Sequence, residues 1–141
     1  MADTVGSWQN ENKQTKLVIM DFRDLLVYKK AFQLDMEIFE ISKKFPKEET
    51  YSLTDQIRRC SRSVCSNIGE SYRKRRYPKH FISKLSDSDS ENAETQVWLE
   101  FAKACNYITN EVFTDLTNES LEVGKMLNHM IGHPEKYGVR I

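Results

Sequence analysis

The side chains best suited to chemistry in this sequence are cations gathered near its middle. Residues 56–76 read QIRRCSRSVCSNIGESYRKRR and end in four consecutive cations. Between residues 58 and 84, nine Lys and Arg stand against one acid, a net charge of +8, although the whole chain has a formal net charge of zero. Residues 87–122 compensate with nine acids against Lys103, a net charge of −8. Such asymmetry is informative about binding partners rather than about the fold.

Cations at this density neutralise phosphates, and tyrosines placed among them can stack on exposed bases. We therefore predict contact with nucleic acid, RNA or DNA. The predicted contact residues are Arg58, Arg62, Arg73, Lys74, Arg75, Arg76 and Lys79, with Tyr72 and Tyr77 as weaker stacking candidates. The alternative is that the acidic surface of one subunit meets the basic surface of the next and builds a ring, or that the charged faces bind a protein partner. The two interpretations are compatible.

A second polar set lies in the same part of the chain. Its members recur at helical spacing beside an apolar seam, so they form one stripe on a helix, and Glu94 is placed with them on a later helix. The set consists of Gln56, Arg59, Ser63, Asn67, Glu70 and Glu94. A ligand site is one interpretation. A stripe of this kind more often fixes helix register by hydrogen bonds or joins subunits, and we expect that role.

The residue types needed for catalysis do not form a recognisable pattern. The histidines at 80, 129 and 133 are not in the Glu-x-x-His arrangement of di-iron bundles, and the five glycines form no phosphate-binding loop. Cys65 is near Arg58 and Arg62 in the sequence, but it lies close to the predicted buried seam. All three cysteines are predicted to be reduced core thiols. We predict a protein without catalytic residues, cofactor or metal site.

Composition favours a single helical domain. The chain has 141 residues, five Gly, three Pro and 30% charged side chains, which suits long helices better than a turn-rich all-β fold. Apolar runs are too short to span a membrane, and the first ten residues lack the features of a secretory signal, so a soluble cytoplasmic protein is expected.

Two helices are predicted in the first half of the chain. Over residues 24–44, one apolar row steps by three or four residues and a second lies beside it, which predicts a helix buried over a wide face and ended by Pro46. That second row contains Leu25, Tyr28, Phe32, Met36 and Phe39. The next helix is expected to begin near Thr54 as its cap, with Leu53, Ile57, Cys60, Val64 and Ile68 on its seam.

Two more helices follow. The third should begin at residues 77–79 and continue through the polar stretch 86–92, because the apolar phase agrees on both sides. Its predicted seam is Phe81, Leu85, Ser88, Asn92, Ala93, Val97, Phe101, Ala104 and Ile108. The fourth begins near Thr109, and Gly132 and Pro134 end it. The predicted fold is therefore all-α: an antiparallel up-and-down four-helix bundle over residues 22–132, with a flexible N-terminal arm at 1–21 and a tail at 133–141.

Several motifs resemble the 23S rRNA-intervening sequence protein family, also called the four-helix-bundle protein family, which includes the accessory variability proteins of diversity-generating retroelements. The similar segments cover roughly residues 22–131. They are residues 24–31 (DLLVYKKA), 45–49 (FPKEE), Leu53 with Gln56 and Arg59, 63–72 (SVCSNIGESY) and the basic run after it, Glu94 with Thr95, and 124–128 (GKMLN). The chain differs from the family pattern at residues 69–71, where Gly-Glu-Ser replaces Ala-Glu-Gly, and at 88–91, where acidic residues replace a small Gly-Ser pair.

The resemblance implies a four-helix subunit and a cyclic homo-oligomer, a homopentameric ring. Members of the retroelement branch are associated with nucleic acid and with a reverse transcriptase. By similarity, this protein is expected to be a non-enzymatic oligomeric binding protein.

Overall fold

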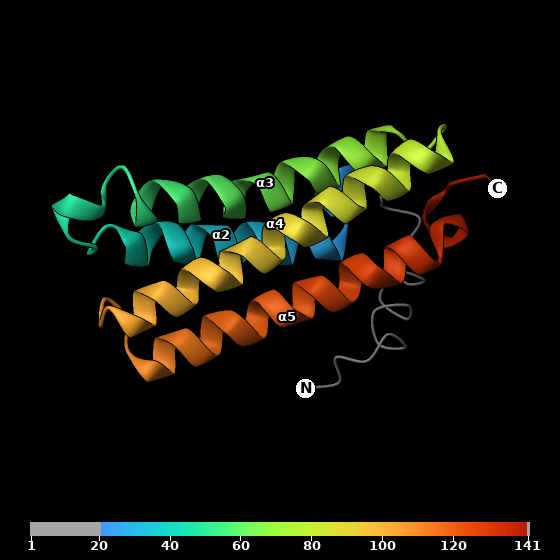
Figure 1. Ribbon diagram of the computed structural model, residues 1–141. Coiled ribbons are helices and arrows are strands. Elements are labelled where there is room, and N and C mark those ends of the chain that lie inside the picture. The colour runs from blue at the N-terminus through green and yellow to red at the C-terminus, as the bar shows by residue number, and fades with distance from the viewer. Residues whose placement is uncertain (1–20, 141) are drawn as a thin grey trace.

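The computed structural model of the protein describes residues 21–140, which form an all-helical bundle (Figure 1). Its long helices are α2 (Leu26–Ser42), α3 (Leu53–Arg73), α4 (Pro78–Ala104) and α5 (Asn110–Gly132). Short 3-10 turns, η2 (Phe22–Asp24), η3 (Lys47–Glu49) and η4 (Pro134–Tyr137), lie before and between them and after α5. No strand is found in the described part of the chain, which confirms the all-α prediction. The 1–21 arm lies outside the described residues except for Asp21.

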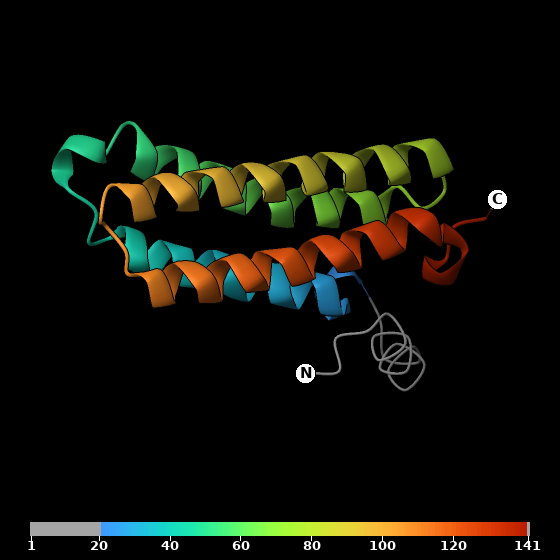
Figure 2. The ribbon, with the colours of Figure 1, turned by 60° about the horizontal axis from the view of Figure 1, so that its bottom comes forward.

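The four helices lie alongside one another and alternate in direction (Figures 1 and 2). α2 packs against α3 and α5, and α4 packs against both α3 and α5. Two apolar clusters fill the interior. One contains Ile68, Phe81 and Leu127, and the other contains Ile38, Ile57 and Leu99. Because the helices alternate in direction, the α3–α4 turn lies at the same end of the bundle as the start of α2 and the C-terminal segment (Figures 1 and 2).

α2 buries one of its two apolar rows. Val27, Ala31, Leu34 and Ile38 are buried, as expected. The prediction of a wide buried face was wrong, since Phe32 is 48% and Met36 43% exposed. A helix in a square bundle faces only two neighbours, so the outer edge of a broad apolar face remains at the surface. These exposed side chains form part of two surface grooves.

α3 begins two residues earlier than a helix capped by Thr54 would. Its N-cap is Ser52, which makes no side-chain capping bond, while Thr54 is buried inside the first turn. The carboxylate of Glu49 instead accepts hydrogen bonds from the Leu53 amide at 3.3 Å and from the Ser52 hydroxyl at 2.6 Å. Thr54 is therefore not the cap, because the preceding 3-10 turn supplies the acceptor.

α4 is continuous through residues 86–92, as predicted. Its buried seam, however, continues through Thr95, Leu99 and Ala102, whereas the second half of the predicted seam is wrong. Val97 is 44% and Phe101 53% exposed. The observed seam keeps the alternating steps of four and three residues that begin at Phe81, and it includes polar side chains. Hydropathy alone therefore selected the wrong phase.

The buried polar groups of α4 are hydrogen-bonded. The Ser88 hydroxyl donates to the Val64 carbonyl at 2.8 Å, and the Asn92 amide donates to the Ser120 carbonyl at 2.9 Å. The Ser120 hydroxyl donates to Asn92 Oδ1 at 2.8 Å, while Gln96 donates to the same hydroxyl at 2.9 Å. At Gly124, a Cβ would lie 3.3 Å from Asn92 Nδ2, so a glycine lets α5 approach this network closely. These bonds fix α4 against α3 and α5.

α5 follows the prediction at both ends. Thr109 caps it by accepting a hydrogen bond from the Val112 amide at 3.1 Å, and the helix ends at Gly132. Residues 133–140 then fold back onto the bundle: Val139 is buried, and the Tyr137 hydroxyl lies 2.7 Å from His129 Nδ1. None of the helices among residues 21–140 has the length and apolar character that a membrane span requires.

Candidate nucleic-acid interface

Three cations of α3, namely Arg58, Arg62 and Arg73, lie along one side of the helix, next to α2. Arg58 donates from Nε to the Ser42 hydroxyl at 2.8 Å, and its guanidinium lies 4.8 Å from the centre of the Phe39 ring. Arg62, one turn further on, lies 5.8 Å from the same ring and is exposed. Arg73 continues this line at the end of the helix. Arg58 is thus held by α2, whereas Arg62 and Arg73 remain accessible.

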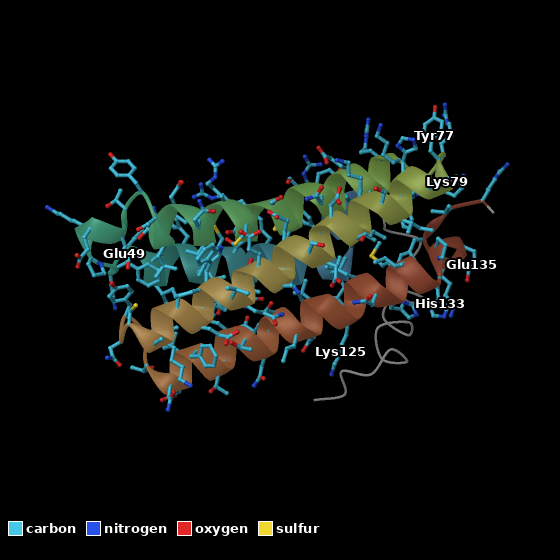
Figure 3. All side chains as sticks on the ribbon, viewed as in Figure 1. Glu49, Tyr77, Lys79, Lys125, His133 and Glu135 are labelled. Atoms are coloured by element: carbon cyan, nitrogen blue, oxygen red, sulfur yellow. The ribbon has the colours of Figure 1, made fainter. Side chains whose placement is uncertain are left out.

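The α3–α4 turn gathers the remaining cations at one end of the bundle. Figure 3 shows Tyr77 and Lys79 there, with Tyr77 pointing away from the helices. Lys74, Arg76 and Lys79 are exposed. Tyr77 is 53% exposed, and its ring centre lies 5.9 Å from that of His80 in an edge-on arrangement. The ion pairs found among residues 21–140 are Arg23–Asp21, Lys30–Glu122, Lys43–Glu40 and Lys84–Glu70. The cations of this turn therefore have no carboxylate partner within the described chain.

Two predicted contact residues are instead turned inward. Tyr72 is only 7% exposed and packs in the core with Val139. Arg75 donates from Nε to the Tyr72 carbonyl at 2.8 Å, and its guanidinium lies 3.7 Å from the centre of the Tyr72 ring. Its Nη1 is 2.9 Å from the place of a Cβ on Gly138, which has φ +85°. Arg75 thus holds the C-terminal segment, and the ring of Tyr72 is closed to bases.

The sequence did contain a signal for Tyr72. It lies four residues after Ile68 and continues the buried seam of α3, which outweighs its position beside the cations.

The predicted polar stripe stays on the surface of α3 in the subunit. Asn67 donates to the Ser63 carbonyl at 2.9 Å within the helix, and Glu70 pairs with Lys84 of α4 at 3.1 Å. Arg59 is exposed and Gln56 half-buried. On α4, Glu94 accepts from the Trp98 indole at 3.3 Å. Within the subunit, the Glu70–Lys84 pair joins the stripe to a neighbouring helix, and a role in joining subunits remains a prediction.

A groove of about 690 Å³ lies between α2 and α3, beside the accessible cations. Three aromatic rings follow its α2 side: Phe22 meets Tyr28 edge-on at 5.1 Å, and Tyr28 stacks on Phe32 at 6.0 Å. Arg62, Arg73, Lys74 and Lys84 line it as well. Tyr28 and Phe32 were predicted to lie on a buried face, and Phe22 was not assigned a role from the sequence. Their exposure depends on which neighbours α2 has.

One buried carboxyl lies at the base of this groove. Asp35 is 8% exposed and accepts a hydrogen bond from the Ser61 hydroxyl at 2.8 Å. Burial raises the pKa of this carboxyl, whereas the Ser61 bond and the nearby charge of Arg62 oppose that rise.

A second groove, of about 720 Å³, separates α2 from α5 and is acidic. Phe32, Met36 and Ile41 contribute apolar surface, while Glu37, Glu40 and Asp115 contribute carboxylates. Burial raises the pKa of nearby Glu119 to about 7, and a hydrogen bond to Glu37 and the charges of Glu37 and Asp115 add to this effect, opposed by Lys30. The carboxyl groups of Glu37, Asp115 and Glu119 therefore lie close enough to repel one another when ionised, and Lys30 offsets this repulsion only in part.

This carboxyl cluster should make stability depend on pH. The folded protein holds the Glu119 proton more tightly than the unfolded chain does. The contribution of Glu119 to stability is therefore fully present below the usual pKa of 4.5 and is lost as pH rises through about 7. Glu119→Gln removes this loss. We expect the midpoint of thermal unfolding of the variant, relative to wild type, to increase between about pH 5 and 8. Glu100→Gln, at an exposed site on α4, is the control. A constant difference across this range would contradict the expectation.

The cysteines differ from one another. Cys60 and Cys65 are buried, as predicted, but Cys105 is exposed at the end of α4, so its assignment to the core was wrong. Burial raises the pKa of the Cys60 thiol to about 11 and that of Cys65 to about 12. Both therefore stay protonated near neutral pH, in which form a thiol is a poor nucleophile.

Comparison with known proteins places this bundle in a family. The sequence profile of the 23S rRNA-intervening sequence proteins matches residues 23–129, which spans all four helices up to the last turn of α5. The chain belongs to the 23S rRNA-intervening sequence protein family. The resemblance seen in the sequence motifs is thereby confirmed.

A solved structure supports this assignment. The crystal structure of a protein with unknown function from the S23 ribosomal protein family of Bacteroides thetaiotaomicron is 30% identical to this family member. It superposes with a TM-score of 0.70 and covers 78% of this chain and 98% of its own. A search of curated proteins finds no significant match.

Proposed function

We propose that this protein is a non-enzymatic, oligomeric binding protein that contacts nucleic acid through the basic surface at the end of α3 and in the α3–α4 turn. The observation that carries the proposal is the group of exposed cations Arg73, Lys74, Arg76 and Lys79, which lack carboxylate partners within residues 21–140. Unneutralised cations attract phosphates, and binding releases the counterions that phosphates hold. The family's link to an RNA insertion is consistent with such a partner.

The test is a variant in which Arg73, Lys74 and Arg76 are all changed to Gln. Arg75 is left unchanged because it bonds to the Tyr72 carbonyl, stacks on the Tyr72 ring and lies against Gly138. Each phosphate contact contributes about 0.7–0.9 to the slope of log affinity against log salt, so the loss of three contacts should reduce that slope by about 2–3. Binding to structured RNA and to duplex DNA is titrated at several salt concentrations.

A matched control changes three exposed lysines elsewhere, Lys44, Lys47 and Lys125, to Gln. It removes the same charge, so equal weakening would indicate a general charge effect and would contradict the proposed surface. Wild-type protein that binds no nucleic acid even at low salt would refute the proposed function.

The second candidate function is a protein-interaction ring in which the charged faces mediate self-assembly or hold a protein partner. The acidic groove between α2 and α5 favours this function. Its carboxylates are complementary in charge to the basic α3 surface, and exposed Phe32 and Met36 supply apolar contact area beside them. If cations hold the subunits together, the triple Gln variant should dissociate and the wild-type assembly should weaken as salt rises. Light scattering on both proteins distinguishes this from nucleic-acid binding. A pentamer is the expected assembly.

A further inference from the structure

We propose that the groove between α2 and α3 binds single-stranded nucleic acid, with bases stacked on aromatic rings of α2 and phosphates held by cations of α3. The inference rests on the proposed function. It adds that the bound nucleic acid is single-stranded, and it names the residues that distinguish a single strand from a duplex. The juxtaposition of two unlike walls, one aromatic and one cationic, carries the argument.

The aromatic wall is built by the helical spacing of α2. Tyr28 and Phe32 are one turn apart, and their ring centres are 6.0 Å apart with the planes inclined by 27°. Phe32 is 48% exposed, so much of its side chain is accessible to a ligand. Phe22 extends the wall, because its ring lies against Gly69, where a Cβ would be 3.3 Å away. Glycine on α3 thus lets the aromatic wall close onto the helix that bears the cations.

The cationic wall runs antiparallel to these rings. Arg62 and Arg73 are eleven residues apart on α3, about 16 Å along the axis, and Lys74 extends the wall at its end. The two acids of the groove already have partners: Glu70 pairs with Lys84 at 3.1 Å, and Asp35 accepts from Ser61 at 2.8 Å. The guanidinium groups therefore remain available for phosphates along a path parallel to the rings.

A single strand fits this surface better than the alternatives. In a duplex the bases are stacked within the helix and present no face to Phe32, whereas every unpaired base can stack on an open ring. An acidic peptide would meet the cations, but the negative face of an aromatic ring does not attract carboxylates. The groove is lined by residues of both α2 and α3, which lie side by side in the bundle (Figure 1).

The test compares wild type with Phe32→Ala by fluorescence anisotropy. The probes are a labelled oligothymidylate of about 12 nucleotides, a typical length for a single-strand site, and a duplex of the same length. Loss of one stacked base should weaken oligothymidylate binding about 5- to 150-fold and leave duplex binding unchanged. Phe32→Trp keeps a stacking face and should retain binding.

Met36→Ala is the matched control. Met36 lies one turn from Phe32 on α2 and is similarly exposed, but it lines only the α2–α5 groove. Its variant should bind oligothymidylate as wild type does. If it weakens binding as much as Phe32→Ala, the α2–α3 groove is not the site.

Other outcomes also separate this inference from the proposed function. If the triple Gln variant loses affinity but Phe32→Ala binds oligothymidylate and duplex as wild type does, the groove inference is overturned and the proposed function stands. If Phe32→Ala dissociates the assembly in light scattering, Phe32 is a subunit contact and the inference is overturned. If wild type does not bind oligothymidylate, the groove inference is overturned; if it binds neither probe and no structured RNA even at low salt, the proposed function fails as well.

Discussion

Phe81→Ala is expected to lower the free energy of unfolding by about 3–5 kcal/mol. Phe81 is completely buried and packs in the cluster that joins α3, α4 and α5 near the α3–α4 turn. Truncation removes a large apolar contact and leaves a cavity that rigid neighbouring helices fill only in part. Equilibrium urea unfolding, followed by circular dichroism at 222 nm, measures the change as a shift in midpoint.

Phe101→Ala is the matched control on the same helix. Phe101 is 53% exposed, so its replacement should change the free energy of unfolding by about 0.5 kcal/mol or less in the isolated subunit. A sequence-based seam through Phe101 predicts instead that both variants lose stability equally. Losses of similar size would therefore contradict the observed phase of α4.

Asn92→Ala is expected to lower the free energy of unfolding by about 1–3 kcal/mol. Asn92 is 2% exposed, and its side chain both donates to and accepts from Ser120 of α5. Truncation leaves buried polar groups without one of their partners, which is more costly than the loss of an exposed hydrogen bond. Urea unfolding again gives the magnitude.

Asn118→Ala is a control at an exposed position of α5, where little change is expected. A double-mutant cycle with Ser120→Ala isolates the interaction between Asn92 and Ser120. The losses of unfolding free energy caused by two substitutions in one hydrogen-bonded network should not be additive. Additive losses at the two sites would show that the bond between α4 and α5 does not contribute to stability.

The number and extent of the helices could be predicted from the sequence. Apolar spacing located α2 and α5, Pro78 marked the start of α4, and Gly132 marked the end of α5. These are local signals: backbone restrictions and side-chain periodicity act over a few residues and do not depend on distant neighbours. The continuity of α4 through a polar stretch was also predicted, but the apolar phase assigned to its second half was wrong, since Val97 and Phe101 are exposed while Leu99 and Ala102 are buried.

The outward or inward direction of particular side chains was less predictable. Tyr72 and Arg75 resemble a binding surface in the sequence, but they close the core against Val139 and Gly138. Val97 resembles a core residue, while Thr95 occupies the core. A polar residue is buried at low cost when a partner is in reach, and whether one is in reach depends on another helix.

The sequence by itself determined that this chain forms four amphipathic helices, with a concentrated basic segment near the connection between the second and third of them. This was possible because periodicity, helix breakers and charge are properties of the local sequence. Only the tertiary structure decided which cations are accessible and which aromatic rings accompany them. Phe32 and Arg62 are thirty residues apart in the chain, and they line one groove because α2 and α3 pack antiparallel. The physical reason is that exposure is a property of packing between helices, whereas helix formation is largely a property of each segment.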